Sequence, residues 1–262
     1  MFRVKNHMEG PFNALFSTVT ARIAAAAPPI MLSLIHIYNF RIEYYIPYFY
    51  GHGITSREQT EVQKHAEKES YAGICDEVRL GVSLIFYLQN VAEYLNEEHF
   101  PRIVGRSVTL SALSISGKII LPMMKNEKQK KTIQKNMQNR NHLIAAARDG
   151  DEDAIENLTL EDMDTYSMLS RRIAYEDVLS IVDTCFMPYG VESDQYSVIG
   201  EILDYRKTVN KITEEEIYIM TIDTNGLVYD VCINKEDLIG EPQIGRRFKG
   251  NIWMQGCIRY MN

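Results

Sequence analysis

Two histidines and a glutamate near the start of the chain are the residues best suited to metal chemistry. His65 and Glu69 are four residues apart, so a helix would place both side chains on one face, as a pair of metal ligands requires. His52 or Asp76 would have to supply the third ligand that a catalytic zinc site usually takes. One hypothesis is therefore a metal-dependent enzyme that uses His52, His65 and Glu69. The alternative is a surface helix on which His65 and Glu69 are ordinary polar residues.

A second group of candidates lies near the carboxyl end, where basic and aromatic residues follow one another. A strand with this composition can stack bases and neutralise the phosphates of single-stranded nucleic acid. The candidate ligand-binding residues are Arg246, Arg247, Lys249 and Trp253. The alternating positions on the other side of such a strand are apolar and suit a core: Phe248, Ile252 and Met254. The alternative is that the basic side chains only decorate the rim of a folded domain.

Composition limits the class of protein. The chain has 262 residues, of which 45% are hydrophobic and 24% charged, as in ordinary globular proteins. Its net charge of −7 argues against a surface built wholly for nucleic acid or anionic lipid. The four cysteines form no CxxC pair, which favours a reduced, cytoplasmic protein. No segment approaches the roughly 18 apolar residues that span a bilayer, so we expect no membrane partner.

The first 37 residues differ in character from the rest of the chain. They show no sustained apolar period, and residues 32–37 resemble the translation of an adapter used in preparing sequencing libraries. The alternative for this hexapeptide is a native apolar strand. We predict that residues 1–37 are a foreign or disordered leader. The unit that follows would then lack its own beginning.

Residues 38–125 predict an α+β unit, a mixed sheet with short helices. Thr55 and Ser56 precede Glu58 and Gln59 at capping-box spacing, which predicts a helix over residues 57–70. Strict apolar alternation predicts a long strand that follows it. The strands are expected over 42–50, 78–88, 107–115 and 118–122, with a short helix around 92–95.

Residues 126–175 predict a helical connector. Residues 126–150 hold six basic and two acidic residues, whereas residues 151–195 hold two basic and twelve acidic ones. The two segments should screen each other, which disfavours nucleic-acid binding by the basic helix. Gly150 suits the left-handed end of one helix and Asp151 the cap of the next. A third helix is expected to begin near Thr159.

Residues 176–262 predict a small β-barrel of the OB type. The Asn225-Gly226 pair is typical of a tight hairpin between two alternating strands. Asn234 suits the cap of a short helix that ends at Gly240. Three meandering strands followed by a glycine-punctuated strand suggest closure into a barrel. The four strands are expected over 197–209, 215–223, 227–234 and 246–258.

A family resemblance covers most of the chain. It rests on residues 65–73, 150–156, 164–168, 186–191 and 245–250. From about Tyr45 to the carboxyl terminus, the chain resembles an uncharacterised family of anaerobic Gram-positive bacteria, catalogued as a domain of unknown function. Residues 1–37 match nothing in that family. The resemblance implies no activity, cofactor or catalytic residue.

These observations together favour a non-catalytic, cytoplasmic binding or interaction module without a cofactor. Its partner is unknown. The two alternatives stay open: single-stranded nucleic-acid or ligand binding by the barrel, and a metal-dependent enzyme.

Overall fold

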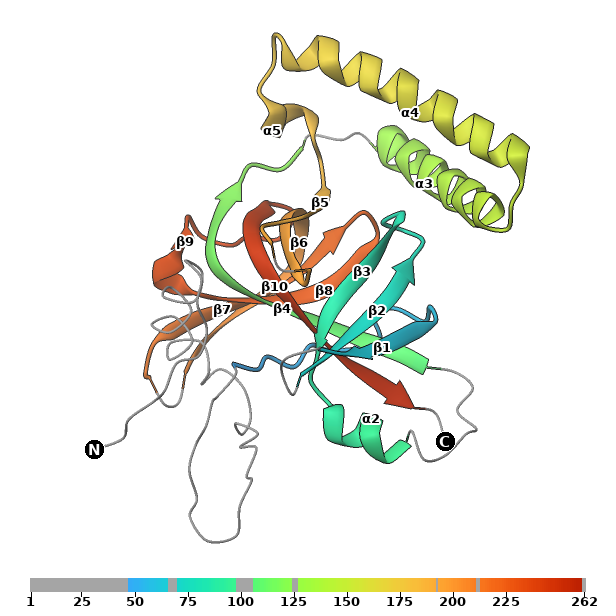
Figure 1. Cartoon of the computed structure of the whole chain (residues 1–262). Helices are drawn as coiled ribbons and strands as arrows, with labels where there is room; N and C mark the ends of the chain where they lie inside the picture. The colour runs from blue at the N-terminus through green and yellow to red at the C-terminus, as the bar shows by residue number, and fades with distance from the viewer. Residues whose placement is uncertain are drawn as a thin grey trace, which may run out of the picture.

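The computed structural model describes residues 47–65, 70–97, 106–123, 127–191, 193–210 and 213–260. At its centre a curved sheet closes into a five-stranded barrel, and two long helices lie to one side (Figure 1). The α+β class with a small barrel, predicted from the sequence, is confirmed. The barrel strands are β4 (Arg106–Ile120), β6 (Gln195–Val209), β7 (Glu216–Thr224), β8 (Leu227–Asn234) and β10 (Arg247–Tyr260).

The order of strands around the barrel is that of an OB barrel with its last strand moved to the front. Strands β6, β7 and β8 form an antiparallel meander, and β8 then pairs with β4 in parallel. β4 pairs with β10, and β10 pairs with the first half of β6, which closes the barrel. An OB barrel has the same neighbours, but there the strand equivalent to β4 comes last in the chain.

Local sequence explains the meander. Asn225 and Gly226 have φ angles of 55° and 85°, the left-handed pair that a tight hairpin of the primed type requires. Their turn joins β7 to β8 in the expected register, with Thr224 opposite Leu227. The barrel interior is filled by alternate side chains, which are fully or nearly fully buried: Val198, Ile202, Met220, Ile222, Val231, Ile233, Phe248, Ile252 and Met254.

A three-stranded extension continues the sheet beyond the barrel. It contains β1 (Thr60–Lys64), β2 (Tyr71–Glu77) and β3 (Val82–Leu88), and β3 pairs in parallel with the end of β10. The alternate side chains Leu84, Phe86 and Leu88 of β3 are buried in the same core as the barrel interior. Helix α2 (Val91–Glu97) follows β3.

The two domains predicted on either side of a connector therefore share one sheet. Strand β4, assigned from the sequence to residues 38–125, is a barrel strand, and β10 lies between it and β3. The boundary placed at residue 125 does not separate two cores. The two strands expected over 107–115 and 118–122 are one long strand, which continues through Ser116 and Gly117 with a register shift.

The helix predicted over residues 57–70 is wrong. Residues 60–64 form strand β1, which makes a hairpin with β2. The Ser56 hydroxyl does accept a hydrogen bond from the Glu58 amide (3.2 Å), so the capping signal was real, but it precedes a strand. Pairing with β2 satisfies the backbone groups of this short polar segment and overrides its helical preference.

The connector is a helical hairpin of α3 (Glu127–Arg148) and α4 (Glu152–Ile173). Gly150 has φ 90° in the turn, and the Asp151 carboxylate accepts a bond from the Ala154 amide (3.1 Å), as expected for the two caps. The third helix expected from Thr159 is part of α4. The remaining elements are α5 (Val178–Ile181), β5 (Cys185–Pro188), η1 (Lys235–Asp237) and β9 (Leu238–Ile239).

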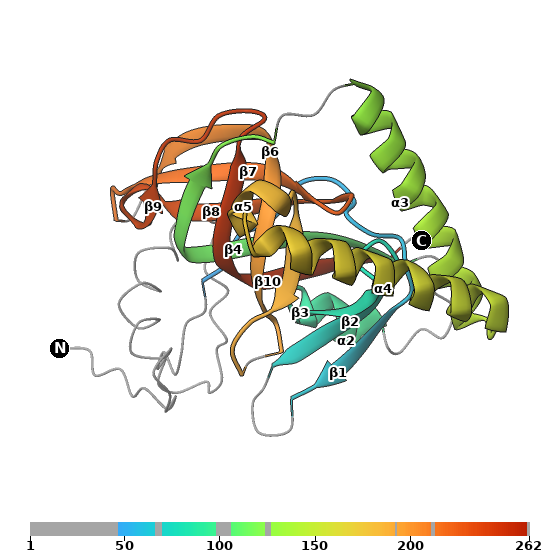
Figure 2. The ribbon, with the colours of Figure 1, turned by 90° about the horizontal axis from the view of Figure 1, so that it is seen from above.

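Seen from above, α3 and α4 lie across one side of the sheet (Figure 2). The residues predicted as a leader, 1–37, lie outside the described part of the chain, so their foreign origin stays a prediction. Among the described helices, none combines the length and the apolar character needed to cross a bilayer.

Candidate functional site

A groove of about 770 Å³ lies between the helical hairpin and the edge of the sheet. One wall is the turn between β2 and β3, the other is formed by α3 and α4, and the tip of the β7–β8 hairpin closes one end. The lining combines three arginines and an aspartate with apolar side chains: Arg79, Arg140, Arg148, Asp162, Leu80, Ile144 and Leu158. A concave surface that mixes apolar area with a few charged groups is typical of a ligand site.

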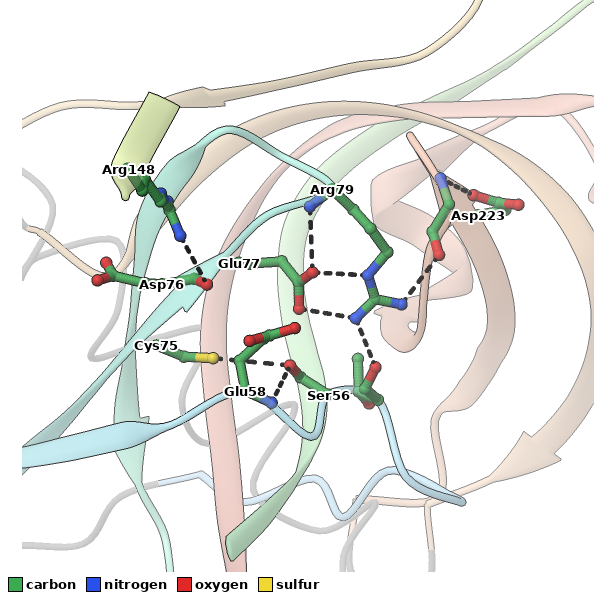
Figure 3. A network of polar contacts seen from close by, with 10 residues as sticks. Ser56, Glu58, Cys75, Asp76, Glu77, Arg79, Arg148 and Asp223 are labelled. Atoms are coloured by element: carbon green, nitrogen blue, oxygen red, sulfur yellow. Dashed lines mark hydrogen bonds and ion pairs between the residues drawn. The ribbon is translucent and has the colours of Figure 1, made fainter. Parts of the chain in front are cut away.

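Arg79 holds the wall of this groove in place. Its guanidinium makes two bonds to the Glu77 carboxylate (2.6 and 2.7 Å). The same group donates to the carbonyl oxygens of Thr55 (2.8 Å) and Gly226 (3.1 Å). Figure 3 shows these bonds radiating from Arg79 to three separate segments. Arg79 therefore ties the β2–β3 turn to the β7–β8 hairpin and to the segment that precedes β1.

The ion pair between Arg79 and Glu77 is partly buried. Glu77 is 2% exposed. Burial raises the pKa of its carboxyl group, but the hydrogen bonds from Arg79 and Ser56 outweigh burial, so the pKa lies below its ordinary value. The bond to Glu77 raises the pKa of Arg79. Beside this pair, burial raises the pKa of the Cys75 thiol, whose sulfur is 3.6 Å from the Ser56 hydroxyl. Cys75 is thus held as an inert thiol.

The other two arginines come from the helical hairpin. Arg140 on α3 pairs with Asp162 (2.7 Å) and, at 3.7 Å, with Glu161, both on α4. Arg148, the last residue of α3, approaches the main-chain oxygen of Asp76 at 3.4 Å (Figure 3). No carboxylate partner of Arg148 is present among the described residues. It is therefore the groove cation with the most capacity to meet an anionic ligand.

The three arginines of the lining limit the chemistry that the groove can carry out. Arginine stays protonated at any physiological pH, so its side chain cannot serve as a general acid or base. The carboxylate in the lining, Asp162, is held by Arg140. What the lining can offer is hydrogen-bond donors and positive charge for carboxylate or phosphate oxygens.

The structure does not give the metal candidates the spacing on which they were chosen. His65 follows strand β1, where its amide donates to the Ser70 carbonyl (2.9 Å) across the hairpin. Glu69 lies outside the described residues. Within the described part of the chain, no group of three His, Cys, Asp or Glu side chains is arranged to hold a metal ion. Residues 60–64, expected to be part of the helix that carries His65, form strand β1, and the metal site stays a prediction.

His52 is placed by an aspartate of the barrel. Its Nδ1 lies 2.8 Å from Oδ2 of Asp230, and its amide donates to the same oxygen (3.0 Å). The second oxygen of Asp230 accepts from the Thr221 hydroxyl (2.7 Å). The His52 side chain is 66% exposed while that of Asp230 is 5% exposed. The pair fixes the segment before β1 to the outside of β8.

Arg247, predicted to bind a ligand, has a buried side chain that bonds main-chain carbonyl groups. It is 4% exposed. Its guanidinium donates to the carbonyls of Leu121 (2.9 Å), Val182 (2.7 Å) and Leu179 (2.9 Å), with a fourth, longer bond to Asp183. Burial lowers its pKa. The side chain thus fastens α5 and the end of β4 to the barrel.

Of the other three ligand candidates, Arg246 directly precedes β10, and Lys249 and Trp253 lie on it. Arg246 and Lys249 are half-buried. Trp253 donates from its indole nitrogen to Asp194 (2.7 Å) and packs against Tyr87, with 5.4 Å between ring centres. Trp253 is about 13 Å from Lys249 along the strand. Nucleic-acid binding by these residues stays a prediction.

The face that OB barrels commonly use for ligands is partly covered here. Such barrels bind on the outside of the second and third strands of the meander, which correspond to β7 and β8. Phe49 packs in a small second core on this face, together with Ile217, Ile219 and Cys232. The Phe49 carbonyl also accepts a bond from Gln89 (3.0 Å). A ligand on this face would have to displace the segment around Phe49.

The groove residues were missed from the sequence for a physical reason. Arg79 lies in a predicted strand, whereas Arg140 and Arg148 lie on one predicted helix, and in both patterns the arginines look like ordinary surface charge. The one available signal was Arg79 near the start of the predicted strand, on the side opposite its apolar residues. There the strand expected over 78–88 begins only at Val82, because residues 78–81 form a turn.

Fold and groove together define an α+β protein in which a permuted OB-type barrel carries a sheet extension and a helical hairpin. The chain belongs to the family described as "Domain of unknown function, E. rectale Gene description" (DUF3881), whose model matches residues 24–256. The match begins upstream of Tyr45 and includes residues 24–37, so the prediction that the whole leader matches nothing in the family is wrong for these residues. Comparison with curated proteins gave no significant match, and comparison with solved structures gave none either.

Proposed function

We propose that this protein is a non-catalytic binding module of the bacterial cytoplasm, and that the groove between the helical hairpin and the sheet takes an anionic ligand. The observation that carries the proposal is the convergence of Arg79, Arg140 and Arg148 on an apolar concave surface. Ile144 and Leu158 would contact the apolar part of the ligand. Arg148 would donate to its carboxylate or phosphate oxygens.

The ion pairs of the groove lining support ligand binding more than general acid or base catalysis. Arg79 and Arg140 are already engaged with Glu77 and Asp162. They present a fixed wall whose geometry a ligand does not need to rearrange. Such preorganisation lowers the entropy cost of binding.

Citrate and tripolyphosphate serve as probes, because they separate the carboxylate from the phosphate form of the same chemistry. Titration of the ¹⁵N-labelled full chain should shift amide signals of the β2–β3 turn and the end of α3. Arg148→Ala should weaken the binding of the preferred probe about tenfold. Arg171→Ala, an exposed arginine on α4 away from the groove, is the matched control. Equal affinity in both variants would refute the groove as the site, as would no response to either probe up to about 10 mM.

A second candidate, single-stranded nucleic-acid binding, is favoured by the OB-type strand order. Titration with a labelled oligothymidylate at low and at moderate salt tests it. Binding that weakens with salt and is lost in a Lys249→Ala, Trp253→Ala variant would support this function. Absence of binding at both salt concentrations would remove it.

A further inference from the structure

One side of α4 carries an exposed stripe without charges. Eight of the 22 residues of α4 are charged, yet none lies at the six positions that make the stripe. These positions are spaced by three or four residues, so at 100° per residue they fall within about 80° of arc. The stripe consists of Ile155, Thr159, Met163, Tyr166, Ser170 and Ile173, all exposed.

The stripe contains large apolar side chains that are exposed to solvent. Ile155 is 48% exposed, Met163 62%, Tyr166 74% and Ile173 45%. The side of α4 that faces α3 is a different one, on which Ala154 is buried and Leu158 half-buried. Figures 1 and 2 show α4 on the outside of the molecule, with α3 on one side of it. A row of exposed apolar side chains of this kind marks an interaction surface.

The order of residues along the stripe is a palindrome. Read from either end it runs isoleucine, a small hydroxyl residue, and then a large side chain. In an antiparallel pair of α4 helices centred between residues 164 and 165, Ile155 would lie within one residue of the position opposite Ile173 of the second copy. Thr159 would face Ser170, and Met163 would face Tyr166, a favourable contact of sulfur with an aromatic ring.

The charges of α4 favour the same orientation. Its six acidic residues all lie between Glu152 and Asp164, and its two basic residues, Arg171 and Arg172, lie at the other end. An antiparallel pair brings the acidic half of each helix beside the basic end of the other. A parallel pair would put the acidic halves together, which is unfavourable.

We propose that α4 is a homodimerisation helix, which pairs antiparallel with α4 of a second copy of this chain through the uncharged stripe. The contact is isologous, as expected for a two-fold dimer. It extends over 19 residues, from Ile155 to Ile173, about 27 Å. One helix pair of this length forms a small interface, so the dissociation constant should lie between about 1 and 100 μM. The dimer does not depend on the groove or on its ligand.

Sedimentation equilibrium of the full chain from about 1 to 300 μM tests the proposal. The unmodified chain should change from monomer to dimer over this range. Met163→Glu, in the stripe, should weaken dimerisation at least about tenfold. Met168→Glu is the matched control, because Met168 lies on the opposite side of α4 and is similarly exposed (59%). A monomer at every concentration, or equal dissociation constants for the two variants, would overturn the proposal.

Disulfide trapping tests the antiparallel orientation separately. It tolerates the replacement of single stripe residues by cysteine. A mixture of Thr159→Cys and Ser170→Cys chains should form the heterodimeric disulfide under mild oxidation. Either variant alone should not, because each cysteine would lie about 16 Å along the axis from its own copy. The unmodified chain controls for the four native cysteines. Cross-linking of each variant with itself and not with the other would exclude the antiparallel pair.

Discussion

Replacement of Arg247 by methionine should lower the free energy of unfolding by about 3 kcal/mol. Methionine retains most of the buried stem but removes the guanidinium. Three of its four bonds to carbonyl oxygens are 2.9 Å or shorter. At about 1.5 kcal/mol for each bond from a charged donor, the loss is roughly 4–5 kcal/mol. The variant also avoids the desolvation cost of the buried guanidinium, which reduces the loss of stability by about 1–2 kcal/mol.

Urea denaturation measures the effect, with Arg246→Met as the control, because Arg246 is adjacent and half-buried. The control should change stability by less than about 0.5 kcal/mol. The thermal midpoint of Arg247→Met should fall by about 6–12 °C. If Arg247→Met were as stable as Arg246→Met, the guanidinium would not be the clamp that fastens α5 to the barrel.

Three other outcomes are expected. The pKa of Glu77 is lower in the folded state than in the unfolded state. The ionised Glu77 carboxylate therefore stabilises the fold above the ordinary pKa of a glutamate, and this contribution is lost as pH falls through the folded pKa. Below about pH 4.5, the urea midpoint should decrease less steeply with falling pH in Glu77→Gln than in the unmodified chain. Tyr196→Phe should cost about 1–2 kcal/mol, because the Tyr196 hydroxyl bonds both the amide (2.8 Å) and the carbonyl (3.0 Å) of Ile85, and equal urea midpoints would contradict this. If the metal hypothesis holds, protein purified without an affinity tag should contain stoichiometric zinc or iron that is lost in His65→Ala, whereas metal retained by the variant would exclude His65 as a ligand.

The carboxyl-terminal strands could be predicted closely from the sequence. The ends of β6, β7, β8 and β10 lie within two residues of the expected ones. Their signals are local: alternation sets which side chains face the core, and Asn225-Gly226 sets the turn. The caps at Gly150 and Asp151 were predictable for the same reason, because a left-handed φ or an amide that needs an acceptor involves only neighbouring residues.

The error over residues 57–70 shows where local signals fail. A capping-box pattern leads to a helix only if the backbone groups of the residues after it do not pair with another strand. Here β2 offers a complete ladder to residues 60–64. Because the sequence of this segment is polar, its tertiary surroundings decided between helix and strand, and residues 60–64 became a strand.

By itself the sequence determined the class of the fold, the turns, the helix caps and the inward-facing residues of the barrel, since each depends on contacts within a few residues. Only the tertiary structure decided that β10 lies between β3 and β4, whose paired residues are between 127 and 168 positions away along the chain. The same long-range pairing turned Arg247 into a clamp and assembled a groove from Arg79, Arg140 and Arg148. No local pattern encodes which distant strands become neighbours, because closing those loops is favourable only once the shared core is buried.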